Sequence, residues 1–371
     1  METKKYAEIT CKVYKTIAHL VTDALQKAGI TEVHIQTGRA VVLREKKGIL
    51  GIGAGEVLDE DPAEVFRFHV PSEQADAVMN TVIAAAHLDS PGRGSIFVND
   101  AEVIRSVHEP VQLSVPTERP VTLASGLMGI CCIVQRGQGN TVIQSALDMG
   151  FSVPVATFGE GTGLRDKLGI LRITIPAEKE VINMTVAEQD AREAMDTLVD
   201  AGKLDQPGKG FIYTYPVGRG LINTKIFRGT QKHAASVEQM ISAIDDIKGS
   251  MEWRKRSGEG RSGAGGRKYL SNLVNFTLVC NEGRAHELVK AAMSVGAAGA
   301  TISKLRYSRL NGTGDDSVSP AREMSDLIVG AAQVDAIRKA IEDADGFGKT
   351  SSAMITLKPV PSACTYLGGS R

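Results

Sequence analysis

Two long segments of this chain repeat each other, and this internal repetition limits the architectures that the chain can adopt. The clearest match lies between LDSPGRG at 88–94 and LDQPGKG at 204–210, where each stretch follows a helical pattern and opens a strand. Three other positions keep one register, 121 residues apart in each case: Cys11 and Cys132, Gly29 and Gly150, Leu43 and Leu164. A third, more diverged segment begins near Leu270. The repeats therefore predict three units of similar size.

The bulk composition is that of a folded protein with no strong preference for a charged partner. At 371 residues the chain has room for two or three domains, and its formal net charge is zero. A neutral chain has no global field to attract nucleic acid, and the longest apolar run, around 130–134, is far too short to span a bilayer. We therefore expect a cytoplasmic protein that has no signal peptide, is not membrane-embedded and has no nucleic acid partner.

The cysteine pattern indicates buried thiols. Of the five cysteines, Cys11, Cys132 and Cys280 lie at or near the same place in three strand-like runs. Small, unreactive thiols inside the units, in a reducing compartment, explain this pattern better than disulfides or metal ligands do.

Hydrophobic spacing in the first unit predicts two helices among four strands. Apolar residues alternate where a half-buried strand is expected and recur every three or four residues where a helix is expected. In chain order the expected elements are strand 8–14, helix 17–28, strand 33–41, strand 65–70, helix 72–83 and strand 96–98. This order is typical of the split βαβ, or ferredoxin-like, arrangement, whose second sheet face must be covered. We therefore predict an α+β fold of three ferredoxin-like (βαββαβ) repeats that form an intramolecular pseudo-trimer within a monomer.

The predicted domain boundaries follow the repeats. Repeat 1 occupies 1–115, repeat 2 occupies 120–228, a helix with a linker occupies 229–268, and a diverged repeat 3 occupies 269–371. An amphipathic helix expected over 236–251 opens with a capping-box pattern, and two roles stay open for it: docking on the chain or gripping a partner. The glycine-rich, basic stretch 254–268 is interpreted as a flexible linker, with a nucleic-acid-binding arm as the weaker alternative.

Each unit carries a glycine-rich turn between its second helix and its last strand. Two glycines around one residue let consecutive backbone amides converge into a concave anion site, and a neighbouring cation strengthens such a site. A tight turn that needs glycine for its backbone angles is the alternative. The three turns are Gly92-Arg93-Gly94, Gly208-Lys209-Gly210 and Gly346-Phe347-Gly348-Lys349.

With these turns and this element order, the chain resembles the P-II family of nitrogen-regulatory signalling proteins, in its P-II-like branch. The most specific segments lie in repeat 2, at 159–163, 168–170, 176–180 and 204–210. The resemblance covers repeats 1 and 2 almost fully and repeat 3 loosely. It implies that an adenine nucleotide (ATP, ADP or AMP) binds as an effector in clefts between the repeats.

The resemblance and the turns together give one set of predicted site residues. Arg105 matches a phosphate-binding arginine of the family, whereas Ala40 and Gly161 stand where the family has the glutamine that helps to hold magnesium and 2-oxoglutarate. No metal is therefore predicted, and sensing of that metabolite is not expected. The residues predicted to bind the nucleotide or another anion are Gly92, Arg93, Gly94, Arg105, Gly161, Thr162, Gly163, Gly208, Lys209, Gly210, Gly346, Gly348 and Lys349.

The predicted function is regulation without catalysis. The seven histidines show no metal-ligand spacing and no nucleophile elbow accompanies them, so no enzyme activity is predicted. Effector binding would order one or more of the loops 38–64, 159–178 and 308–325 and so control a partner protein, either a transporter or an enzyme. Two alternatives stay open: a scaffold with vestigial clefts that acts through the 236–251 helix, and an enzyme acting on a nucleotide or metabolite.

Overall fold

The computed structural model describes residues 4–46, 55–105, 120–163, 177–228, 267–310 and 317–366. The first part of the chain forms β1 (Lys4–Tyr14), α1 (Ala18–Lys27), β2 (Glu32–Lys46), β3 (Gly55–Val70), α2 (Ala75–Ala86) and β4 (Gly94–Arg105). The middle part forms β5 (Ala124–Gln135), α3 (Gly139–Asp148), β6 (Val155–Gly163), β7 (Glu178–Ala187), α4 (Ala191–Gly202), β8 (Gly210–Leu221) and β9 (Phe227–Arg228). The last part forms β10 (Leu273–Asn281), α7 (Ala285–Ser294), β11 (Gly299–Arg309), β12 (Ala321–Gly330), α8 (Val334–Asp343), β13 (Met354–Val360) and β14 (Ala363–Thr365).

All of these strands belong to one 14-stranded sheet, in the order β14-β8-β5-β7-β6-β11-β12-β10-β13-β4-β1-β3-β2-β9. Three further pairings, β8 with β4, β6 with β2 and β11 with β2, connect strands that are distant in this order. Through them a ring closes in the order β8-β5-β7-β6-β2-β11-β12-β10-β13-β4, with β4 pairing back to β8. Because the ring closes, the strands that would otherwise be edges find hydrogen-bonding partners.

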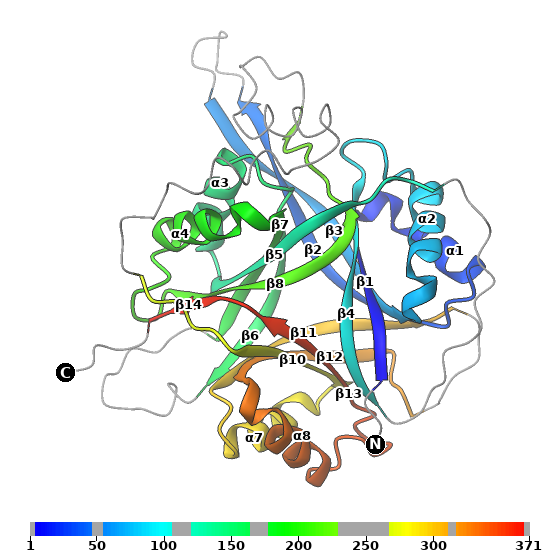
Figure 1. Ribbon diagram of the computed structural model, residues 1–371, viewed down its shortest axis with the longest axis vertical. Helices are drawn as coiled ribbons and strands as arrows, with labels where there is room; N and C mark the ends of the chain where they lie inside the picture. The colour runs from blue at the N-terminus through cyan, green and yellow to red at the C-terminus, as the bar shows by residue number, and fades with distance from the viewer. Residues whose placement is uncertain are drawn as a thin grey trace.

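The helix pairs α1 with α2, α3 with α4 and α7 with α8 cover the outside of the closed sheet (Figure 1). The outward-facing residues of the strands are apolar and pack against these helices, because successive side chains of a strand point to opposite faces. Three separate buried clusters result: one contains β1 with α1 and α2, one β5 with α3 and α4, and one β10 with α7 and α8. Cys11, Cys132 and Cys280 lie in different clusters, and all three are free and buried, which confirms the prediction of buried thiols.

The predicted fold class is wrong. In place of three ferredoxin-like α+β repeats arranged as a pseudo-trimer, the described residues form a mostly β structure: a closed antiparallel β-barrel of 10 strands, with 4 further strands and 6 short helices. The reason is the pairing across unit boundaries. At Gly38, β2 pairs with Thr157 of β6, and at Ile96, β4 pairs with Leu221 of β8, so the strands join one sheet. The barrel likewise conflicts with the expected description of the repeats as P-II-like and ferredoxin-like.

Several predicted segments lie outside the described residues. They are the 236–251 helix, most of the 254–268 linker and the central parts of the three long loops. At the end of the predicted linker, Arg267 forms ion pairs with two aspartates. Its guanidinium lies 3.1 Å from Asp196, in α4, and 3.2 Å from Asp205, which follows α4. Among the described helices, none is long and apolar enough to cross a membrane.

Candidate functional site

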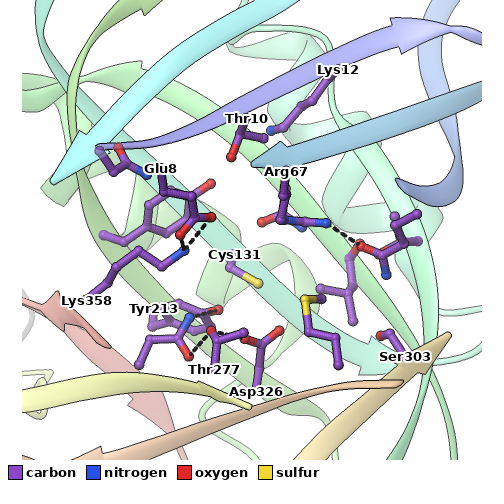
Figure 2. Close-up of a pocket in the computed structure, with 18 of the residues that line it drawn as sticks. Glu8, Thr10, Lys12, Arg67, Cys131, Tyr213, Thr277, Ser303, Asp326 and Lys358 are labelled. Carbon is purple, nitrogen blue, oxygen red and sulfur yellow. Dashed lines mark hydrogen bonds and ion pairs between the residues drawn. The ribbon is translucent and has the colours of Figure 1, made fainter. Parts of the chain in front are cut away.

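A polar chamber lies inside the barrel, where three distant parts of the chain meet (Figure 2). Its lining includes side chains from each of the strands β1–β8 and β10–β13, so no single segment of the sequence contains it. Most of the lining residues are polar, and the charged ones are Glu8, Lys12, Arg67, Asp326 and Lys358. Such a concentration of charge inside a barrel requires partners or a ligand, because an isolated buried charge is costly.

Strand alternation brings the polar residues into the chamber. On β1 the side chains of Ile9, Cys11 and Val13 belong to the apolar cluster beneath α1 and α2. The intervening residues therefore face inward, and Glu8 and Lys12 line the chamber while being only 3% and 7% exposed. The polar face of this strand is thus enclosed by the barrel and shielded from bulk solvent.

Glu8 and Lys358 form a buried ion pair on one wall. The Lys358 ammonium lies 3.1 Å from one carboxylate oxygen of Glu8 and 3.0 Å from the other. Burial alone would raise the pKa of Glu8, but the charges of Lys358, His69 and Arg67 outweigh it and lower the pKa below its ordinary value. Glu8 is therefore ionised at neutral pH, and its charge is compensated.

Lys12 has a different environment in the same chamber. Its ammonium lies 5.1 Å from the centre of the Phe97 ring, and among the described residues no carboxylate pairs with it. Burial lowers the pKa of Lys12 to about 7 because the charged form is poorly solvated; the nearby charge of Arg67 lowers it further, against a small opposing effect of Cys131. Near neutral pH this amine is therefore partly uncharged.

Arg67 is the second of the chamber's cations that has no carboxylate partner in the described structure. One of its terminal nitrogens donates to the side-chain oxygen of Gln36 at 2.9 Å, and a dashed line from Arg67 in Figure 2 marks this hydrogen bond. A guanidinium carries five N–H donors in a fixed, planar arrangement. Arg67 consequently keeps donors for a ligand.

The facing wall is a network of hydroxyl, amide and carboxylate groups. Thr277 donates to Asp326 at 2.7 Å, and Asn275 donates to the hydroxyl of Tyr213 at 3.3 Å. Cys131 also lines this region, but burial raises the pKa of its thiol to about 12, so the thiol stays protonated. These groups provide hydrogen-bond donors and acceptors around the cations without supplying a nucleophilic thiolate.

The chamber is small. Its volume of about 60 Å³ corresponds to roughly four to six water molecules, since each water needs about 10–15 Å³ measured in this way. A ligand of a few non-hydrogen atoms fits such a space. In the described part of the chain no group of three or more histidine, cysteine, aspartate or glutamate residues is arranged to hold a metal ion.

No family model matches the chain, and no curated protein matches it. The function is therefore inferred from the side chains of the chamber.

The predicted turn of repeat 1 lies outside the chamber. The Arg93 guanidinium donates to the carbonyl of Ala86 at 3.0 and 3.2 Å, which places it at the C-terminal end of α2. Gly92 has a φ of 83°, and a Cβ atom there would come within 2.9 Å of Lys225. A Cβ on Gly94 would approach the carbonyl of Lys12 to 2.5 Å. Both glycines thus have structural reasons to be glycine.

The predicted residues of repeat 2 are divided between two places. Gly161, Thr162 and Gly163 belong to β6, where they pair with Thr301, Ala300 and Gly299 of β11, so they form a strand and not a loop. In the second turn, Gly208 has a φ of 72° and its carbonyl accepts from Gln135 at 2.9 Å. The carbonyl of Gly210 accepts from Thr365 at 3.0 Å. Lys209 lies between these two glycines and is half-buried.

The turn of repeat 3 is held by contacts within its own loop. The amide of Gly346 donates to the carbonyl of Ile341 at 2.9 Å, and the carbonyl of Gly348 accepts from Ser352 at 2.7 Å. The neighbouring Lys349 is exposed. Arg105 ends β4 opposite Met354 of β13. Among the predicted site residues whose side chains the structure describes, none lines the chamber, and the structure does not gather these into one site; their role in anion binding stays a prediction.

None of the chamber residues was predicted from the sequence, although a signal was present. On β1, polar and apolar residues alternate from Glu8 to Val13, and the polar positions are those that face inward. The same alternation is found in strands with a solvent-exposed face. Only the pairing of distant strands distinguishes an enclosed polar face from a solvated one.

Gly129 provides a test of how tightly the chamber wall is packed. It lies opposite Tyr215 in the β5–β8 pairing, and a Cβ atom there would overlap the tyrosine ring. Gly129→Ala is expected to lower the free energy of unfolding by about 1–3 kcal/mol, because the ring must move toward the chamber. Chemical denaturation measures this change. Gly163→Ala is the control: its Cβ atom would lie 3.3 Å from the carbonyl oxygen of Ala298, a tight contact without overlap, so a smaller loss is expected. Equal stability of both variants would contradict the packing described.

Proposed function

We propose that this protein is a non-enzymatic binding protein that senses a small anion held in the chamber by Lys12 and Arg67. One observation carries the proposal: two cationic side chains face an enclosed polar space, and in the described structure neither is paired with a carboxylate. The third cation, Lys358, already has Glu8 as its partner. A bound anion would give Lys12 and Arg67 a direct ion-pair partner.

Chamber size argues for a compact ligand. A space equivalent to roughly four to six waters accommodates a small carboxylate, sulfate or phosphate and is far too small for an adenine nucleotide. The planar N–H groups of Arg67 suit the oxygen atoms of such an anion, and the hydroxyl and amide groups of Thr277 and Asn275 lie on the facing wall. The ligand class supported here is therefore a small oxyanion.

The pH dependence of binding follows from Lys12. Below its pKa of about 7 the amine is already charged, whereas above it anion binding must also take up a proton. Sulfate affinity is therefore expected to fall with rising pH, by up to about tenfold per pH unit above neutrality. The other titratable or charged groups around the chamber are Glu8, Arg67, His69, Cys131, Tyr213, Tyr215, Asp326 and Lys358.

Calorimetric titration with sulfate tests the proposal. Arg67→Gln is expected to weaken sulfate binding about tenfold to a hundredfold, as hydrogen bonds to charged groups contribute about 1.5–3 kcal/mol. Lys209→Ala, in the glycine turn outside the chamber, should leave it unchanged. Sulfate binding that depends on Lys209 and not on Arg67, or that shows no dependence on pH, would overturn the proposal.

A further inference from the structure

We infer that the chamber takes a two- or three-carbon oxo acid, whose carboxylate pairs with Arg67 while its carbonyl carbon is captured reversibly by the amine of Lys12 as an imine. This inference rests on the proposed function, because it names the class of anion that the same site would hold. It adds a covalent bond that simple anion binding does not require.

The contrast between two lysines of one chamber supports the assignment. Lys358 contacts both oxygens of Glu8, at 3.0 and 3.1 Å, so its ammonium is engaged in an ion pair. Lys12, 7% exposed, lies over the Phe97 ring and has no carboxylate partner among the described residues. A buried amine beside another cation loses its proton more easily, and the free amine is the nucleophile.

Arg67 explains why a carboxylate would accompany the carbonyl. It faces the chamber together with Lys12, and one of its terminal nitrogens donates a hydrogen bond to Gln36 at 2.9 Å. Its charge makes the Lys12 amine harder to protonate and at the same time attracts the ligand's carboxylate. On the facing wall Asp326, hydrogen-bonded to Thr277 at 2.7 Å, offers a negative charge to the cationic imine.

The size of the chamber limits the ligand. The equivalent of roughly four to six waters matches the five or so non-hydrogen atoms of glyoxylate or the slightly larger pyruvate. Longer oxo acids need more room than the volume of about 60 Å³ provides. The smallest members of this class are therefore the ligands that fit.

The capture step balances without any further reactant. The nitrogen of Lys12 forms a bond to the carbonyl carbon, the carbon–oxygen double bond breaks, and the oxygen leaves as water with the two protons of the amine. The neutral imine then takes one proton from solvent to become the iminium. Hydrolysis reverses these steps, so the ligand can be released intact.

Reductive trapping tests the inference. The full chain is incubated with glyoxylate and cyanoborohydride in mildly alkaline buffer, and peptide mass mapping locates the carboxymethyl group that reduction leaves on a lysine. We expect Lys12 to be modified at least tenfold faster than the exposed Lys349, and Lys358 to stay unmodified. Arg67→Gln should slow trapping of glyoxylate at Lys12 by about tenfold or more, yet leave trapping of the uncharged glycolaldehyde unchanged.

The outcomes separate this inference from the proposed function. Modification of Lys12 no faster than that of Lys349, in protein that still binds sulfate, would overturn covalent capture and leave anion binding intact. Equal loss of glyoxylate and glycolaldehyde trapping in Arg67→Gln would overturn the role given to the carboxylate. Absence of both sulfate binding and Lys12 modification would overturn the two proposals together.

Discussion

Replacement of Lys12 by methionine is expected to stabilise the protein while abolishing anion binding. In the unfolded chain this lysine has its ordinary pKa of 10.5, whereas burial in the chamber lowers it to about 7. Folding at neutral pH therefore costs on the order of 4 kcal/mol at this position. Methionine has a similar length and no charge to desolvate, so that cost disappears. A functional site that opposes stability in this way is a common trade-off.

The pH dependence of this gain has a definite sign. Because the folded pKa lies below the unfolded one, the full cost is present below pH of about 7 and vanishes as the pH rises toward 10.5. Guanidinium denaturation of the Lys12→Met and wild-type proteins across this range measures the difference. Lys12→Arg, which keeps a charge at every accessible pH, is the matched control and should show no gain. A Lys12→Met protein that is no more stable than wild type near neutral pH would show that the amine is not desolvated.

The second large effect is expected at the buried ion pair. Lys358→Met removes the ammonium that contacts both oxygens of Glu8 and leaves the carboxylate buried and uncompensated. Loss of one partner of a buried pair costs about 3–5 kcal/mol, so the variant should unfold at markedly lower denaturant concentration. The loss should be specific to the unpaired charge, since methionine preserves the volume of the lysine stem.

A double variant tests this explanation. Glu8→Gln combined with Lys358→Met removes both charges and should recover most of the lost stability. The pH dependence again has a defined direction: pairing lowers the pKa of Glu8, so its contribution is present above the ordinary value of 4.5 and is lost in acid as the carboxylate is protonated. The deficit of Lys358→Met should therefore shrink below pH of about 4. A double variant as unstable as the single one would refute the charge-based account.

Local features of the fold could be predicted from the sequence, but the architecture could not. The alternation of Ile9, Cys11 and Val13 identifies β1, and the helical spacing of Val21 and Leu25 identifies α1, because these patterns depend only on neighbouring residues. How strands join depends on hydrogen bonds between backbones far apart in sequence. The pairing of β2 with β6 at Gly38, which helps to close the barrel, left no periodic signal to read.

The candidate site could be predicted even less well, for a related reason. Gly92 and Gly208 were predicted as site residues because glycine turns can be recognised in a sequence. In the structure both have a positive φ, which accounts for the residue type. Lys12 and Arg67 are ordinary surface residue types until the barrel encloses them. Lys12, Arg67 and Asp326 lie far apart in the sequence. That they share a chamber can be recognised only once the pairing of the strands is known.

Ring closure also sets the order of events during synthesis. The ring requires β13, which pairs with β10 on one side and with β4 on the other, and β13 is translated after every other strand of the ring. Until β13 emerges from the ribosome, β4 and β10 lack it as a pairing strand. The carboxylate of Glu8 likewise has no Lys358 with which to form its ion pair. Nascent chains thus expose open sheet edges for most of their translation, a period in which chaperones or intermolecular pairing would compete for them.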